Sequence, residues 1–134
     1  MGAALSAELG GCASAFADSS SPEPSRVQSF HSSARWQLHF NEVKDTPKLM
    51  VIDFFASWCG PCKFIEPDIQ AMAEKFTDVE FAKIDVDELS DVAREFQVQA
   101  MPTFVLVKKG KEIDRVVGAK KDELERKIET NRAP

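Results

Sequence analysis

Residues 49–63 constrain the fold of this chain more than any other stretch. They begin with an apolar run at 49–55, interrupted once by Asp53, which is typical of a buried strand. The run continues through Trp58 into Cys59-Gly60-Pro61-Cys62. Apolar residues then recur every three or four positions, at Phe64, Ile65, Ile69, Met72, Ala73 and Phe76. The stretch therefore predicts a central strand, a tight turn and a helix whose first turn contains both cysteines.

The position of this cysteine pair predicts redox chemistry. A thiol reacts as its thiolate, which is favoured by the partial positive charge and the free N–H groups at a helix N-terminus. We expect Cys59 at the exposed end of the helix as the attacking sulfur. Cys62 would lie one turn further in and less exposed, as the resolving sulfur.

Two other uses of the pair stay open, although both fit less well. A Cys₄ zinc site needs a second pair, and Cys12 is the one other cysteine in the sequence. The two histidines, His31 and His39, do not have metal-ligand spacing with the pair. A structural disulfide across four residues would constrain the unfolded chain very little. The sequence thus favours a redox disulfide, with no metal site.

Composition indicates one globular domain and excludes several functions. The chain has 134 residues, 43% hydrophobic and 29% charged, with a net charge of −5. The negative charge argues against nucleic acid as a partner and against an anionic membrane as a default partner. Three cysteines are too few for a disulfide scaffold, which favours a reducing compartment such as the cytoplasm. No apolar run approaches the roughly 20 residues of a membrane span.

Residues 1–25 differ from the rest of the chain. Ala, Ser, Gly and Pro supply 17 of these 25 residues, and no hydrophobic period runs through them. We predict a disordered N-terminal extension, followed by a single domain over residues 26–134. The segment does not resemble a secretory signal, because it lacks a basic region and Glu8 interrupts its short apolar stretch.

The extension carries a candidate lipidation signal. Residues 1–6, Met-Gly-Ala-Ala-Leu-Ser, fit the pattern for N-myristoylation of Gly2 after removal of Met1. One myristoyl chain gives only marginal membrane binding, and a second acyl chain on Cys12 would supply the missing anchor. The alternative is that Gly2 and Ser6 match by chance and that Cys12 is a spare thiol.

From Arg26 onward the sequence predicts the element order βαβαβαββα, which is an α/β fold with a mixed sheet and helices on both faces. The expected strands are 26–33, 49–55, 79–85, 103–107 and 112–117, the last two joined by a hairpin turn at 108–111. The expected helices are 34–44, capped by Ser32 or Ser33, then 60–76 with a kink at Pro67, 89–96 and a final amphipathic helix around 122–128.

Four residues besides the cysteines are candidates for the site. Burial of Asp53 in the apolar strand would raise its pKa, and it could exchange a proton with Cys62; alternatively it faces a water pocket or caps a turn. A cis bond before Pro102 would place the backbone of Met101 beside the cysteine turn, ready to pair with an extended substrate. Lys83 is more simply a snorkelling lysine at a strand edge. Trp58 is expected to be partly exposed.

Together these residues resemble a thioredoxin, from about residue 26 to the C-terminus. The resemblance is carried by residues 53–62, Pro67, 100–104 and 117–119. Residues 64–67, 99–102 and 116–124 resemble more narrowly the plant cytosolic h-type group, and an extension with Gly2 and Cys12 is similar to its members with long N-termini. Phe30 stands where many h-type members carry a cysteine, so redox dimerisation through that position is not expected.

The resemblance implies a thioredoxin fold and a protein-disulfide reductase. Cys59 would form a mixed disulfide with a target protein, and Cys62 would resolve it. Thioredoxin reductase, using NADPH, would restore the dithiol, so no cofactor bound to this chain is expected. Asp53 would be a buried proton carrier with Lys83 nearby. The implied substrate surface comprises Trp58, Gly60, Pro61, Met101, a cis Pro102, Gly118 and Ala119.

Other functions remain open at this point. Within redox chemistry, the chain could take electrons from glutathione, or could oxidise or isomerise disulfides. In a different class, the apolar surface around Trp58 could belong to a non-catalytic binding or holdase module.

Overall fold

The computed structural model describes residues 25–132. Within these residues the chain forms β1 (Val27–Phe30), α1 (Ser33–Lys44), β2 (Leu49–Phe55), α2 (Gly60–Lys75), β3 (Glu80–Asp85), α3 (Ser90–Glu95), β4 (Thr103–Lys108), β5 (Lys111–Val117) and α4 (Lys121–Asn131). The order of elements is the predicted one. Apart from Ser25, the predicted extension lies outside the described residues, and so do Gly2 and Cys12.

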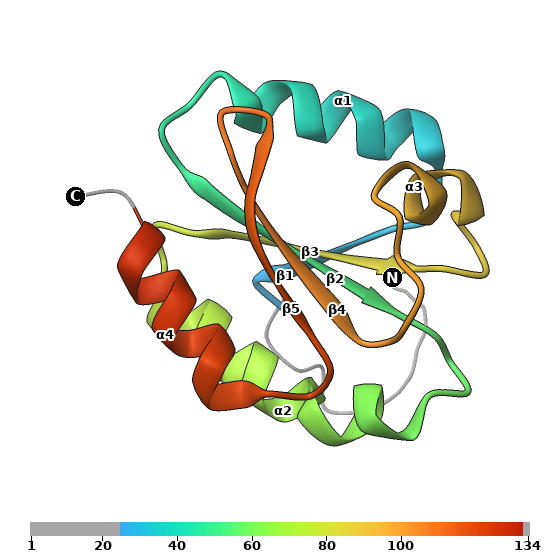
Figure 1. Ribbon diagram of the computed structural model, residues 1–134. Coiled ribbons are helices and arrows are strands. Elements are labelled where there is room, and N and C mark those ends of the chain that lie inside the picture. Colours follow the sequence, from blue (N-terminus) through green and yellow to red (C-terminus); the bar gives the residue numbers. More distant parts are fainter. Residues whose placement is uncertain (1–24, 133–134) are drawn as a thin grey trace, which may run out of the picture.

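The five strands form one mixed sheet in the order β1-β3-β2-β4-β5. Strands β1, β3 and β2 run parallel, whereas β4 is antiparallel to β2 and β5 is antiparallel to β4. Helices α1 and α3 cover one face of the sheet, and α2 and α4 cover the other (Figure 1). The predicted α/β architecture is therefore confirmed.

Strand β2 lies at the centre of the sheet, and its side chains alternate between two cores. Met50, Ile52 and Phe54 pack with α1 and α3. Leu49 and Val51 pack with α2 and α4. This alternation places Asp53 on the face covered by α2 and α4. Because β2 is hydrogen-bonded along both edges, to β3 and to β4, the end of the strand is fixed in position, and so is the start of the cysteine turn that follows it.

The first strand is shorter than predicted, because the chain turns into a helix earlier. A strand over 26–33 is expected from sequence, but β1 ends at Phe30. Ser32 then acts as the N-cap of α1, and its hydroxyl accepts a hydrogen bond from the Arg35 N–H at 3.3 Å. Of the two predicted caps, Ser32 is the correct one.

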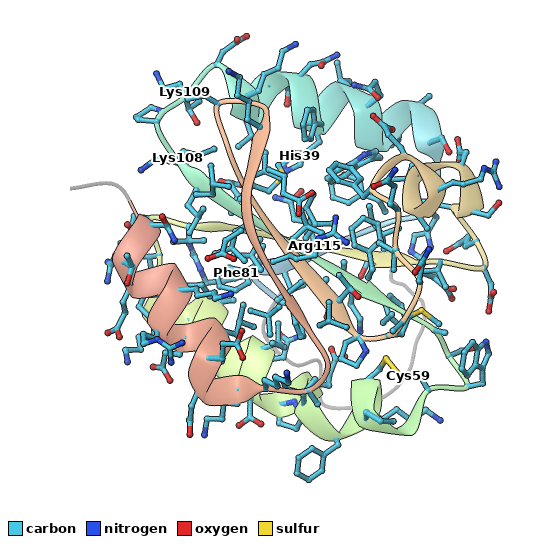
Figure 2. The ribbon with its side chains drawn as sticks, viewed as in Figure 1. His39, Cys59, Phe81, Lys108, Lys109 and Arg115 are labelled. Carbon is cyan, nitrogen blue, oxygen red and sulfur yellow. A yellow bond between two sulfur atoms is a disulfide. The ribbon has the colours of Figure 1, made fainter. Side chains whose placement is uncertain are left out.

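The predicted hairpin between β4 and β5 is confirmed. Lys109 and Gly110 connect the two strands with φ values of 55° and 80°. Two consecutive residues with positive φ are typical of the two-residue turns that match the twist of paired strands, and glycine adopts this conformation without steric cost. The turn lies at the end of the sheet opposite Cys59 (Figure 2).

In the described part of the chain, none of the helices is both long and apolar enough to cross a bilayer.

The two cores predict how stability responds to truncation of a phenylalanine. Phe104 is fully buried in β4, so Phe104→Ala should lower the free energy of unfolding by about 3–5 kcal/mol. Phe64→Ala removes the same atoms from a side chain of α2 that is 77% exposed, and should change stability by less than about 1 kcal/mol. Urea denaturation of both variants measures the difference. Equal losses would contradict the placement of Phe104 in the core.

Candidate active site

The two cysteines lie at the N-terminus of α2, immediately beyond the end of β2. Cys59 is the N-cap residue, and its Sγ accepts a hydrogen bond from the Cys62 N–H at 3.2 Å. Pro61 is accommodated because N–H groups in the first turn of a helix lack an intrahelical acceptor. Cys59 and Cys62 form a disulfide with their Cα atoms 5.3 Å apart. The helix N-terminus is thus directed at the Cys59 sulfur, in the position that favours a thiolate.

Cys59 is more deeply buried than the sequence predicts. Its exposed fraction is 4% and that of Cys62 is 6%, so the expectation of an exposed attacking sulfur above a less exposed resolving one is wrong for this disulfide form. The cause is packing in three dimensions. Phe55 and Ala56 from the end of β2, together with Val86 and Met101 from segments far away in sequence, surround the pair. A target must therefore approach closely to reach the Cys59 sulfur.

The loop before β4 supplies one wall of the site. The Met101-Pro102 peptide bond is cis, as the thioredoxin resemblance implies. The carbonyl oxygen of Met101 lies 3.6 Å from the Sγ of Cys59. The Pro102 carbonyl accepts a hydrogen bond of 2.8 Å from the Gly118 N–H, which fastens this loop to the end of β5. The fold thus holds two backbone segments, far apart in sequence, beside the disulfide.

Trp58 is exposed but anchored. The side chain is 66% exposed, in agreement with the expected partial exposure. Its indole Nε1 donates a hydrogen bond of 2.9 Å to Asp87 in the loop after β3. That loop is itself held by the Asp87 N–H, which donates to Asp85 Oδ1 at 2.8 Å. An indole fixed by its polar edge keeps its apolar face available beside the disulfide.

The remaining predicted surface residues differ in exposure. Gly60 and Pro61 are exposed, Met101, Gly118 and Ala119 are half-buried, and Pro102 is buried. Gly118 has a φ of 101°, a conformation that favours glycine. Ala119 packs against the core beneath α4. The structure thus brings the predicted residues to one end of the sheet, with Met101 half-buried and Pro102 buried.

Asp53 is buried in β2 on the face covered by α2. Its exposed fraction is 5%, and its Oδ1 has no hydrogen-bond partner among the described residues. Burial raises the pKa of Asp53 from 3.8 to about 7, an effect that the charge of Lys83 reduces and that of Glu66 increases. The alternative that Asp53 caps a turn is wrong, because it lies within the strand. A carboxyl of this kind can gain or lose a proton near neutral pH.

Lys83 does not lie at a strand edge, contrary to the simpler expectation. It belongs to β3, which is paired on both sides, and its backbone lies opposite Asp53. The Lys83 Nζ forms an ion pair of 2.7 Å with Glu66 of α2 and lies 4.5 Å from the centroid of the Phe55 ring. The proximity of Lys83 to the buried acid, which the resemblance implies, is confirmed.

Sequence reasoning missed two residues of this site, Glu66 and Asp87. Both act on a residue more than 15 positions away, Glu66 on Lys83 and Asp87 on Trp58. No local pattern marks such partners, because they meet only when strands and helices pack. As for metals, residues 25–132 contain no group of three or more His, Cys, Asp or Glu side chains placed to hold an ion.

The fold and the site define a thiol–disulfide oxidoreductase: a disulfide at a helix N-terminus, beside a cis-proline loop and directly after a strand that carries a buried carboxyl. The family model described as Thioredoxin matches residues 31–130. The chain therefore belongs to the thioredoxin family, and with its cysteine pair it is a protein-disulfide reductase.

Relatives place the chain beside plant h-type thioredoxins. It is 65% identical to Thioredoxin H2 of Arabidopsis thaliana over 133 residues, which cover 99% of this chain and 100% of the relative. It is 63% identical to Thioredoxin H2-2 of Oryza sativa subsp. japonica, with 78% of each chain covered. The crystal structure of thioredoxin NaTrxh from Nicotiana alata is 70% identical, with a TM-score of 0.82, and covers 86% of this chain and all of that one.

The raised pKa of Asp53 predicts how stability depends on pH. The folded protein keeps this proton between about pH 4 and pH 7, where the unfolded chain releases it, so ionised Asp53 destabilises the fold above pH 7. Asp53→Asn should therefore raise the free energy of unfolding of the oxidised protein at pH 8, by at most about 4 kcal/mol. The gain should fall away as the pH is lowered through 7 toward 4.

Urea denaturation at pH 4 and pH 8 measures this effect, with Asp122→Asn as the control. Asp122 is an exposed carboxylate in the first turn of α4, where a negative charge is favourable. Its replacement should lower stability slightly, by less than about 1 kcal/mol. A gain for Asp53→Asn that did not change with pH would contradict the raised pKa.

Proposed function

We propose that Cys59 is the nucleophile of this disulfide reductase and that Cys62 is the resolving thiol. The Cys59 thiolate attacks one sulfur of a target disulfide, which forms a mixed disulfide and releases the other target sulfur as a thiolate. Cys62 loses its proton and attacks the Cys59 sulfur, which releases the second target thiolate and leaves the Cys59–Cys62 disulfide. The target gains two electrons. The Cys62 N–H that donates to Cys59 Sγ carries this assignment, because it favours the thiolate on Cys59.

Asp53 accepts the proton of Cys62 in this proposal. A proton acceptor works best when its pKa is close to the operating pH, and the pKa of Asp53 is raised to about 7. The Oδ1 of Asp53 supports the role, because it accepts no hydrogen bond from residues 25–132 and a carboxylate already held by strong donors would be a poor base. Lys83 supports it as a nearby positive charge.

The target chain binds as an extended segment against the loop at Met101. The Met101 carbonyl, 3.6 Å from Cys59 Sγ, is placed to accept a hydrogen bond from the backbone of such a segment. The anchored indole of Trp58 supplies an apolar contact on the same side. Gly60, Pro61, Pro102, Gly118 and Ala119 complete the surface. Small and rigid residues there allow the target backbone close to the sulfur.

Electrons reach the protein from NADPH through thioredoxin reductase, and no cofactor is held by this chain. Membership of the thioredoxin family supports this donor. Besides thioredoxin reductase, the partners are target proteins that contain disulfides. Nucleic acid is not a partner. We place the protein in the cytoplasm, in keeping with its similarity to h-type thioredoxins.

Residues 1–25 serve as an extension through which the protein attaches to membranes, by a myristoyl chain on Gly2 and a palmitoyl chain on Cys12. The similarity to Thioredoxin H2 of Arabidopsis thaliana runs through this region, since it covers 99% of the chain. The described chain enters β1 at the start of the parallel strands, whereas Cys59 follows the end of β2. A tether would thus join the domain at the end of the parallel strands opposite the disulfide.

Reduction of insulin, with NADPH consumption by purified thioredoxin reductase as the readout, tests the proposed chemistry. Cys59→Ser should lower turnover by more than about 100-fold, because the nucleophile is lost. Cys62→Ser should trap a mixed disulfide through Cys59, visible by intact mass. Cys12→Ser is the matched control and should retain activity. Insulin reduction with glutathione but not with thioredoxin reductase would show that glutathione is the electron donor. Insulin binding without any reduction would indicate a holdase.

Co-expression with an N-myristoyltransferase tests the extension. The wild-type protein should gain the mass of one myristoyl chain and sediment partly with vesicles, because one chain gives weak binding. Gly2→Ala should abolish both effects, since the acyl chain is attached to the Gly2 amine. In plant cells, Cys12→Ser should move the protein from the membrane fraction to the soluble fraction. An unmodified Gly2 under both conditions would contradict the tether.

A further inference from the structure

Lys83 forms its ion pair with a residue of α2 and not with the acid beside it in the sheet. Lys83 and Asp53 lie directly opposite each other on β3 and β2, and both side chains are on the face covered by α2. Two opposite charges on the same face of neighbouring strands attract each other, so a direct ion pair is the expected arrangement. Instead, Lys83 Nζ bonds to Glu66 Oε1 at 2.7 Å, and Asp53 Oδ1 has no hydrogen-bond partner among the described residues.

Glu66 is held in position by its own contacts. It lies on α2 four residues after Cys62, so both face the same side of the helix. Its second oxygen, Oε2, accepts a hydrogen bond of 3.2 Å from Gln70 Nε2. Gln70 Oε1 in turn accepts a bond of 2.6 Å from the Ser25 hydroxyl. The ring of Phe55 contacts Lys83 Nζ from a further side. Lys83 is therefore held between α2 and an aromatic ring.

We infer that Glu66 is a positioning residue for the disulfide reductase: its carboxylate holds the Lys83 ammonium along α2 and so controls how readily Asp53 keeps its proton. The sequence does not assign this role to Glu66, and no local pattern around it indicates one. Any effect of Glu66 on turnover rests on the role proposed for Asp53 as proton acceptor. The effect of Glu66 on the protonation of Asp53 is independent of that role.

The surroundings of Asp53 leave few other charges to account for its behaviour. From β3 the charged neighbour is Lys83, and from α2 it is Glu66. Cys62, one turn before Glu66 on α2, carries no charge in the disulfide form. Strand β4 places Phe104 opposite Asp53. Helix α4 contributes Leu124 and Ile128 to the same core, and β1 places Ser29 beside Lys83.

Each of the two charges affects the pKa of Asp53 in a known direction. Burial raises this pKa most, the ammonium of Lys83 lowers it, and the carboxylate of Glu66 raises it. Glu66 has a second influence, because an ammonium that is already neutralised attracts a neighbouring carboxylate less. Removing the charge of Glu66 should therefore act twice, by ending a repulsion and by freeing Lys83 for Asp53.

The test is an NMR titration of the Asp53 carboxyl carbon in the oxidised, ¹³C-labelled full chain. Glu66→Gln keeps the size of the side chain and one of its two acceptor oxygens but removes its charge; the other oxygen, which accepts from Gln70, becomes an NH₂ donor. The Asp53 titration midpoint should fall by about one pH unit, as expected for an opposite charge that becomes available nearby. Glu74→Gln is the matched control, because Glu74 is an exposed carboxylate of the same helix, two turns beyond Glu66, and should leave the midpoint unchanged.

A double variant separates the two effects of Glu66. In a Lys83→Gln background, Glu66→Gln can act only through direct repulsion, so its effect on the midpoint should be at most half of that in the wild type. An equal effect in both backgrounds, an unchanged midpoint, or an equal shift in Glu74→Gln would overturn the inference. Amide spectra of each variant show whether it is folded.

Enzyme kinetics link the positioning to turnover. If Asp53 accepts the Cys62 proton, the pH profile of insulin reduction by Glu66→Gln should move to lower pH by the same amount as the midpoint. A shifted midpoint with an unshifted profile would leave the positioning by Glu66 intact and would contradict the role proposed for Asp53. The two failures are thus distinguishable.

Discussion

The burial of β2 between two sheet neighbours and two layers of helices is the constraint on which the site depends. Both edges of the strand are hydrogen-bonded, to β3 and β4, and its side chains fill both cores. A strand held in this way cannot shift its register without moving apolar residues to the wrong face. The strand therefore fixes the position of Asp53 in the sheet and the point where the chain enters α2 at Cys59. The packing of the core thus determines where the disulfide lies.

The same burial creates the unusual carboxyl. Asp53 is fixed in the strand, so it cannot turn to solvent, and Lys83 opposite it is bound by Glu66. Local rules favour an apolar residue at this position or a close cross-strand ion pair, and neither is present. Exceptions of this kind tend to occur at functional sites, where stability is lost in exchange for chemistry. The raised pKa of Asp53 and the lack of a partner for its Oδ1 among the described residues share one origin in the packing of β2, β3 and α2.

Much of the fold could be predicted because the decisive signals are local. The alternation and run lengths of apolar residues gave the order of the elements, and Lys109-Gly110 marked the hairpin. Ser32 was one of two predicted caps. The strand at 26–33 was predicted too long, because a helix cap competes with strand pairing and the sequence does not rank the two. The cis bond before Pro102 followed from family resemblance rather than from local preference, which favours trans.

The sequence by itself determined the chemistry: two cysteines at a helix start, an acid in an apolar strand and a proline before a core strand. Such features depend on residues that are close together in the chain, so their chemical role can be inferred from the sequence alone. The tertiary structure alone decided the surroundings: the burial of Cys59 beneath Met101 and Val86, the anchor of Trp58 at Asp87, and the choice of Glu66 over Asp53 by Lys83. These contacts join segments far apart in sequence, and only packing brings their side chains within a few ångströms of each other.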